Sequence, residues 1–250
     1  MTTWSKNEYG HPFAARRPVA SQLRQGIEPM SAISSEGPLT PIELPPPKPD
    51  RALSFYDAVA QRRTIREIAP AQLPLEQLSN LLWVAFGVNR TTGPDGALGR
   101  TAASASNSQE IDLYVALEEG LYLYDAVTHR LNLVAAGDLR SGAINPRQGA
   151  GFTVLAPVQL IYVADIHRLT HTIGHQEPGL HDPEIQKSYY FVDTGLIAGN
   201  VYLFAAAHGL AAWFHNCDQS RLSTCIGLRP EQRVLFAQSV GWPAGAEATP

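Results

Sequence analysis

From about residue 54 onward, apolar positions recur in spacings that alternate between helix-like and strand-like segments. Residues 54–63 predict a short helix, because Ser54 and Asp57 stand in the spacing of a capping box. A second helix is predicted from Pro74 to about Gly87, where apolar residues recur every three or four positions. They would share one helix face: Leu75, Leu78, Leu81, Leu82 and Ala85.

Strand-like segments follow. Residues 111–117 alternate between apolar and polar positions, and 121–134 predict a β-hairpin that turns near 126–129. The continuous apolar run 157–164 predicts a buried strand. Further along, a strand near 210–214, a helix near 219–226 and a strand near 233–240 are expected. Because strands and helices interleave without strict alternation, the pattern favours an α+β fold.

A long helix is predicted from about Pro183 to His208. Its second half, residues 196–207, is apolar almost all round and is expected to be buried on most sides. Charged residues make up only 17% of the chain, which fits a large subunit interface, although an ordinary compact domain is the alternative. We predict that this helix packs near the two-fold axis of a homodimer.

Residues 1–50 differ in composition from residues 51–250, which we interpret as one domain. Nine of the 19 prolines lie in the first fifty residues, so this segment can be neither a helix nor a central strand. Apolar residues such as Trp4, Tyr9 and Phe13 favour an extended arm laid over a neighbouring subunit. A disordered tail remains the alternative.

Several classes of protein are disfavoured. The net charge is −4 and no basic run carries interleaved aromatics, which argues against nucleic-acid binding. Cys217 and Cys225 lack metal-ligand spacing and predict neither a zinc site nor a disulfide framework. No signal-peptide pattern and no membrane-length apolar run is recognised, so a cytoplasmic protein without a membrane span is expected.

Three segments carry candidate chemistry. Arg62, Arg63 and Arg66 place three guanidiniums within five residues, and Thr64 adds a hydroxyl, which favours a phosphate site. The alternative is a solvated basic helix end. Residues 100–110 are rich in small side chains that permit close approach of a flat ligand, and Asn107 and Gln109 offer donors and acceptors. This stretch can equally be an ordinary Ser/Ala-rich loop.

The third segment, residues 209–218, follows the long helix. A strand that ends in small and polar residues can present a backbone N–H to a ligand, whereas the alternative is a core strand in which Trp213 serves only packing.

In their order and spacing, these segments resemble the nitroreductase family, and especially its azole-forming peptide dehydrogenase branch. The resemblance covers about residues 54–243 and implies an α+β nitroreductase-like fold. In that fold a mixed or antiparallel sheet is flanked by helices and the homodimer is intertwined, with each active site built between two subunits. The matching segments are Arg62–Arg66, Ala103–Glu110, Gly195–Asn200, His208–Ala211 and Gly241–Pro243.

The resemblance also implies a bound flavin mononucleotide (FMN) and roles for particular residues. Arg62 and Arg66 would hold the phosphate, while Arg63 and Thr64 would line the ribityl chain or the pyrimidine edge of the ring. The backbone near His215 and Asn216 would lie by the flavin N5. The motif before the strand contributes Ser104, Asn107 and Gln109, of which Asn107 would meet the ring.

The chain departs from the family pattern in four places. Ala103 precedes Ser104 where proline is usual, and Glu110 stands where proline usually follows the glutamine. No basic pair follows Gly241–Pro243, which leaves open how the phosphate site is completed. Bulky residues at 213–215 replace the usual small ones and predict a narrower pocket.

The implied reaction is a two-electron reduction, driven by NADH or NADPH, of a nitroaromatic, quinone or related small-molecule acceptor. Oxidation of azolines in modified peptides is one alternative, and a flavin-binding protein without turnover is another. The flavin itself carries the hydride, so no catalytic side chain is assigned.

His167, His171 and His175 are spaced as a helix would align three metal ligands. Their neighbours Thr170, Thr172 and Gly174 weaken such a helix, so we expect a surface or substrate-facing loop and no metal.

Overall fold

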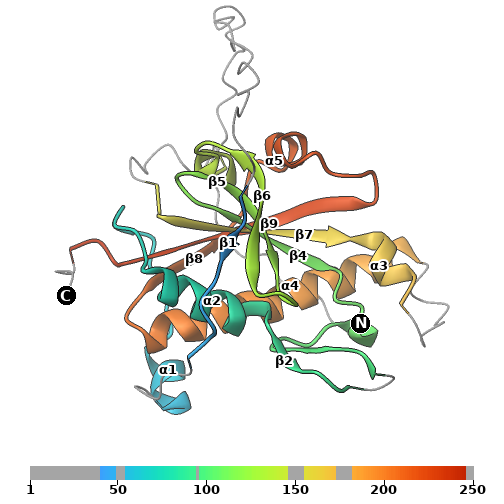
Figure 1. Cartoon of the computed structure of the whole chain (residues 1–250), viewed down its shortest axis with the longest axis horizontal. Helices are drawn as coiled ribbons and strands as arrows, with labels where there is room; N and C mark the ends of the chain where they lie inside the picture. Colours follow the sequence, from blue (N-terminus) through green and yellow to red (C-terminus); the bar gives the residue numbers. More distant parts are fainter. Residues whose placement is uncertain (1–39, 49–53, 94–95, 146–154, 173–181, 246–250) are drawn as a thin grey trace, which may run out of the picture. The chain divides into compact units, whose positions relative to one another are not determined.

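The structure is a computed structural model that describes residues 40–48, 54–93, 96–145, 155–172 and 182–245. All of these residues belong to one compact unit, Ser34–Pro250. The fold is α+β, as the sequence predicts, and its centre is a seven-stranded sheet (Figure 1).

Every strand pairing in the described part of this sheet is antiparallel. From one edge to the other, the strands are β1 (Ile42–Glu43), β6 (Arg130–Ala136), β5 (Gly120–Asp125), β4 (Ile111–Ala116), β7 (Val158–Asp165), β9 (Gln232–Gly241) and β8 (Ala211–His215). A separate two-stranded ribbon, β2 (Val88–Arg90) with β3 (Gly99–Arg100), was not expected from the sequence. The expected hairpin is confirmed as β5 and β6, and β8 forms an edge of the sheet.

Helices cover both faces of the sheet (Figure 1). On one face lie α1 (Phe55–Gln61), α2 (Leu75–Phe86) and the long α4 (Pro183–Ala207), and on the other lie α5 (Gln219–Ile226) and the short η3 (Arg140–Ala143). Two elements are short: η2 (Ala105–Asn107) precedes β4, and α3 (Ile166–Thr170) follows β7. Each side has its own hydrophobic core, so the sheet separates two apolar layers.

Local capping explains where the helices begin. The Ser54 hydroxyl accepts a hydrogen bond from the Asp57 amide at 3.2 Å and donates to the Asp57 carboxylate at 2.6 Å, as the capping pattern predicts. Asp182 accepts a hydrogen bond from the Glu184 amide at the start of α4. Pro183 follows it in the first turn, where its missing N–H costs nothing.

Helix α4 is long and apolar enough to cross a membrane by length and composition alone. In the structure it is a core helix, because Ile197, Val201 and Phe204 are buried against the sheet and α2. The expectation that residues 196–207 are buried on most sides is confirmed, since Leu196, at 45%, is the one exposed residue among them. The earlier residues Phe191 and Val192 are exposed as well. Phe191, Val192 and Leu196 form an exposed strip on α4, and at its edge the Phe191 ring lies 5.7 Å from the ring of Phe236 in β9.

Order begins earlier in the chain than the sequence indicates. Residues Ile42 and Glu43 form the edge strand β1 beside β6, and Leu44 is buried. The carbonyl of Pro45 accepts a hydrogen bond from the Ser79 hydroxyl at 2.6 Å. Lys48 forms a salt bridge of 2.6 Å with Glu76 of α2. The described end of the proline-rich segment therefore packs against its own protomer, and the remainder of that segment lies outside the described residues.

Candidate functional site

The loop that follows α1 runs beside the edge strand β8. The amide of Ile65 donates to the carbonyl oxygen of Ala212 in β8 at 3.1 Å, and Ile68 bridges to Pro243 just after β9. Edge strands leave backbone groups unpaired, and this loop satisfies one of them. The pairing carries Arg62, Arg63, Thr64 and Arg66 along the open edge of the sheet.

Tyr202 of α4 connects this loop to β8. Its phenolic oxygen accepts from the Phe214 amide at 2.9 Å and lies 3.1 Å from the Thr64 hydroxyl oxygen. The Arg62 guanidinium lies over the Tyr202 ring, 5.8 Å from its centroid, within range of a cation–π interaction. Sequence reasoning missed Tyr202, because a tyrosine inside an apolar helical run is indistinguishable from a packing residue.

Arg66 reaches a different surface. Its guanidinium lies 5.9 Å from the centroid of the Trp213 ring, whereas Arg62 lies against α4. Consecutive side chains of a strand point to opposite faces, so Trp213 and Phe214 diverge and the two arginines approach β8 from opposite sides. None of Arg62, Arg63 and Arg66 forms a salt bridge with an acidic group in the described part of the chain. These guanidiniums therefore remain available to an anion.

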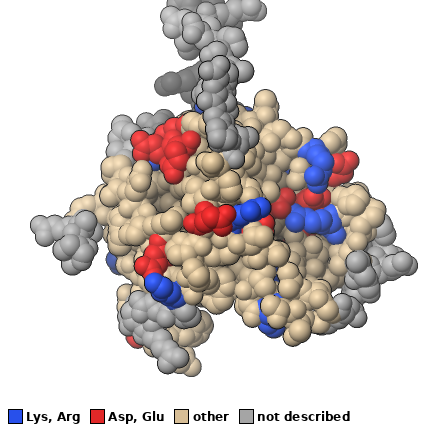
Figure 2. Space-filling model, viewed as in Figure 1, with Lys and Arg blue, Asp and Glu red and all other residues tan. Residues whose placement is uncertain are grey.

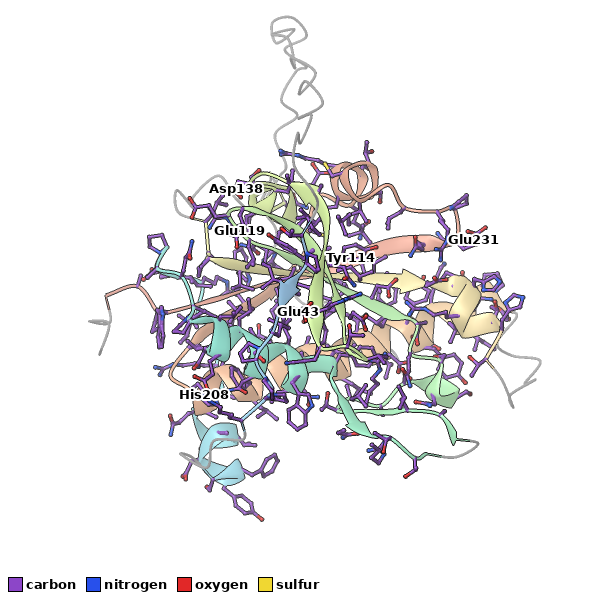
Figure 3. The ribbon with its side chains drawn as sticks, viewed as in Figure 1. Glu43, Tyr114, Glu119, Asp138, His208 and Glu231 are labelled. Carbon is purple, nitrogen blue, oxygen red and sulfur yellow. The ribbon has the colours of Figure 1, made fainter. Side chains whose placement is uncertain are left out.

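A cavity of about 500 Å³ opens between this loop and the end of α4. His208, labelled in Figure 3, marks that end of α4, which lies beside α1. Arg62 and Arg63 line the cavity and Arg66 does not. Of the two arginines expected to hold the phosphate, only Arg62 therefore lines it, together with Arg63, which was expected beside the ribityl chain or the ring. The other lining residues are Ala60, Gln61, Ile65, Ala205, Ala206, Gly209, Leu210 and Pro243.

The end of β8 presents His215 and Asn216 in different ways. His215 is buried: its Nε2 lies 2.9 Å from the Ser239 hydroxyl and its Nδ1 lies 3.0 Å from the Asn216 carbonyl oxygen. Burial lowers the pKa of His215, which favours the neutral imidazole. Asn216 is exposed, and no acceptor for its backbone N–H occurs among the described residues. The imidazole thus fixes the carbonyl group of Asn216, the residue whose N–H has no acceptor within the described ranges.

The second predicted cluster is the loop before β4. Ser104 accepts a hydrogen bond from the Gln109 amide at 3.0 Å, and the Gln109 side-chain amide donates to Asn107 at 3.0 Å and to the Leu98 carbonyl at 2.7 Å. Arg100 donates to Gln109 at 2.6 Å. These contacts bring Ser104, Asn107 and Gln109 together as one hydrogen-bonded unit.

The backbone of this loop is strained. Ser106, Asn107 and Gln109 have φ values of 52°, 53° and 50°, in the left-handed region that non-glycine residues avoid. Each such residue costs on the order of 1 kcal/mol or more unless its surroundings compensate. A loop held in this way presents its side chains in one fixed arrangement.

The two predicted clusters lie apart within one protomer. The loop before β4 contacts α4 at Asp193, through the Ala105 amide at 2.8 Å, whereas the arginine loop contacts α4 at Tyr202. These helix positions are nine residues apart, which corresponds to roughly 14 Å along the axis and about half a turn around it. The clusters therefore contact opposite sides of α4, and one ligand cannot bridge them around the helix.

The histidine segment does not form a described metal site. His167 and His171 stack with ring centroids 4.0 Å apart and planes 4° from parallel. Stacked rings place their faces, not their nitrogen lone pairs, toward each other. His175 lies outside the described residues, and no cluster of three His, Cys, Asp or Glu side chains suited to a metal occurs within the described ranges.

Comparison with known proteins shows that the chain is an oxidoreductase of a flavin-dependent family. The nitroreductase family model matches residues 59–242, and the chain belongs to this family. A crystal structure from Ralstonia eutropha, provisionally named a nitroreductase, is 32% identical with a TM-score of 0.72. That match covers 89% of this chain and 97% of the other. The sequence-based assignment of family and fold is confirmed.

Two other solved structures share the fold. The microcin synthetase McbBCD complex of E. coli, with truncated pro-MccB17 bound, has a TM-score of 0.60 at 14% identity, covering 88% of this chain and 84% of that one. The NADPH:FMN oxidoreductase of Vibrio harveyi, complexed with NAD⁺, has a TM-score of 0.51 at 18% identity, covering 78% and 72%.

Proposed function

We propose that the protein is an FMN-dependent enzyme that uses NADH or NADPH to reduce a nitroaromatic, quinone or related small-molecule acceptor by two electrons. The observation that carries this proposal is the edge of β8. There, within the part of the chain that the structure describes, exposed arginines without a salt bridge lie beside a backbone N–H without an acceptor, in a chain that belongs to the nitroreductase family. Such an edge fits a ligand with a phosphate at one end and a polar ring at the other.

The donor set fits FMN. Arg62 and Arg63 line the cavity beside α1, where a terminal phosphate would find charge-assisted hydrogen bonds without competition from a protein carboxylate. Arg66 would add its charge from the side of Trp213. All three arginines belong to the loop that follows α1, which supports a phosphate held by this loop.

At the other end, the Asn216 N–H would donate to the polar edge of the ring, held in place by the buried His215. The Phe214 N–H is already taken by Tyr202, so Asn216 is the better candidate for this contact. Thr64 would donate to the ribityl chain or the pyrimidine edge while its hydroxyl remains near Tyr202. When bound, FMN supplies the hydride chemistry, and these residues bind and orient it.

We further propose that two copies of the chain complete each site. Ser104, Asn107 and Gln109 contact the side of α4 opposite to the arginine loop, so within one protomer they are too far from it to share a ligand. A two-fold partner would bring its own loop to the edge of β8. Symmetric dimers commonly build sites in this way.

The exposed strip of α4 supports this dimer. Phe191, Val192 and Leu196 are large, apolar and exposed. A Cβ added at Gly195 or Gly199 would meet nothing within 4 Å, which leaves room for close approach of another helix. Figure 2 shows a different face, on which α2 lies in front of α4 and the charged side chains are gathered in small groups. We propose that this strip is the centre of the interface.

The proline-rich residues 1–50 are proposed to be an arm of the domain formed by residues 51–250. The packing of residues 40–48 on β6 and α2 supports an attached arm over a free tail. A cytoplasmic location is also part of the proposal, as the sequence leads us to expect.

A second candidate function is FMN-dependent oxidation of azolines in modified peptides. The fold neighbour from the microcin synthetase complex favours it, since that complex was solved with a peptide precursor bound. The two functions differ in their substrate and in the direction of hydride transfer.

Stopped-flow mixing of the purified, FMN-loaded protein with NADH and with NADPH tests the proposal. Loss of the flavin absorbance near 450 nm within about a second, followed by recovery on adding a quinone, is expected for the reductase. Flavin that stays oxidised with both nucleotides would contradict it. An azoline-containing peptide that then bleaches the flavin would establish the dehydrogenase, and no bleaching at all would indicate a binding protein without turnover.

A further inference from the structure

Two acidic side chains lie buried side by side beneath the loop before β4. Glu110 at the start of β4 is fully buried and Asp193 of α4 is 4% exposed. Their carboxyl groups are within hydrogen-bonding reach of each other. Buried carboxyl groups normally pair with a cation, and no salt bridge to either is present in the described part of the chain.

These two carboxyl groups hold opposite ends of the strained loop. Asp193 accepts from the Ala105 amide at 2.8 Å, where the loop begins to turn. Glu110 accepts from the Ser108 hydroxyl at 2.6 Å, where the loop joins β4. Between these attachment points lie Ser106 and Asn107, both in the left-handed region. The pair therefore spans the segment whose backbone most needs external support.

The pair requires a proton. Glu110 Oε1 is buried and receives no hydrogen bond from any donor in the described residues. Two carboxylates in contact repel each other, whereas one shared proton turns the contact into a hydrogen bond. Burial, followed by the charge of Asp193, raises the pKa of Glu110 to about 7, and burial raises that of Asp193.

The charged side chains packed around Glu110 and Asp193 bind other partners. Arg168 of α3 donates to the Glu110 backbone carbonyl at 3.1 Å and to Asp112 of β4 at 2.6 Å. Asp165, at the end of β7, binds Arg229 through its side chain. Arg100, on the other side of the loop, is directed to Gln109. None of these cations reaches the two carboxyl side chains, so the proton is their source of compensation.

We propose that Glu110 and Asp193 share one proton and act as positioning residues for the loop that carries Ser104, Asn107 and Gln109, so that FMN binding requires this proton. The inference rests on the proposed function, because it takes that loop to contact the flavin. Loss of the proton leaves two buried negative charges in contact, and movement of Asp193 away from Glu110 would release the Ala105 amide. The loop would then lose the attachment that holds its strained turn.

The test compares FMN affinity at pH 7 and pH 9, a range over which the FMN phosphate stays ionised. The wild type should bind on the order of tenfold more weakly at pH 9, because affinity falls as the required proton becomes harder to hold. Glu110→Gln and Asp193→Asn each provide a permanent N–H donor between the two groups, so their affinities should be equal at both pH values. Glu184→Gln, at an exposed site on α4, is the control and should behave as the wild type.

A measurement without flavin separates this inference from the proposed function. Hydrogen exchange of the Ala105 amide, compared at pH 9 between apoproteins, should be faster in the wild type than in Glu110→Gln. Equal exchange in the two proteins, or a pH dependence of FMN affinity that persists in both variants, overturns the inference. Failure of the wild type and of every variant to bind FMN at either pH counts against the proposed function. In that case the exchange rates of the Ala105 amide still test whether Glu110 and Asp193 share a proton.

Discussion

Removing the hydroxyl of Tyr202 is expected to loosen the loop that carries the arginines. Tyr202→Phe keeps the ring under Arg62, so the cation–π contact survives. It deletes the acceptor of the Phe214 amide and the partner of the Thr64 hydroxyl. A hydrogen-bond donor left without an acceptor costs about 1–3 kcal/mol, and the site is only half-buried. We therefore expect a loss of about 2 kcal/mol in the free energy of unfolding.

For a domain of this size, 1 kcal/mol corresponds to roughly 2–4 °C in the thermal midpoint. Tyr202→Phe should lower the midpoint of the apoprotein by about 4–8 °C in a calorimetric scan and weaken FMN binding in a titration. Tyr189→Phe, on the same helix, removes a hydroxyl that has no hydrogen-bond partner among the described residues and is the matched control. A midpoint within about 1 °C of the wild type, together with unchanged FMN affinity, would refute the role assigned to Tyr202.

Three further predictions address the phosphate site, the dimer and the buried acid pair. Arg62→Ala combined with Arg66→Ala should weaken FMN affinity at least about a hundredfold, since each charge-assisted contact contributes roughly 1.5–3 kcal/mol. Arg233→Ala, at a remote exposed site, is the control and should leave the affinity unchanged. If the double variant binds FMN as tightly as the wild type in a titration, the phosphate lies elsewhere. Leu196→Glu should shift the protein to monomers in sedimentation velocity. Leu75→Glu, at a nearly equally exposed site on α2, is the control and should leave the protein dimeric. A wild type that is monomeric at micromolar concentration would contradict the dimer. The pKa of Glu110 is raised from an ordinary 4.5 to about 7, so the folded protein holds a proton that the unfolded chain releases, and stability should fall as the pH rises from about 4.5 to 7 by up to roughly 3 kcal/mol. Glu110→Gln should flatten this part of the stability curve, and an unchanged slope in denaturant titrations would show that Glu110 is not the group responsible.

The sequence predicted those features that depend on local chemistry. The cap at Ser54, the leucine face of α2 and the hairpin between β5 and β6 follow from nearby residues, and all three are present in the structure. The family and its fold could be recognised because five loose motifs occur in the right order. The edge strand β1 was not predicted, since two residues carry no periodic signal.

The remaining features depend on contacts between segments far apart in the chain. Tyr202 gains its importance only because α4 places its hydroxyl against the Phe214 amide. Glu110 was recognised as a departure from the family pattern, but its partner Asp193 lies 83 positions away and no local pattern connects the two. Likewise, the spacing of the motifs gave no indication that the two candidate clusters contact opposite sides of α4.

The most direct test of the central claim is the visible spectrum of the purified protein, followed by identification of any flavin released by heat. The protein should be yellow, with absorbance near 450 nm, and the released cofactor should be FMN and not FAD, because the arginine loop fits a single terminal phosphate. A colourless protein that does not regain this spectrum when incubated with excess FMN would contradict the account.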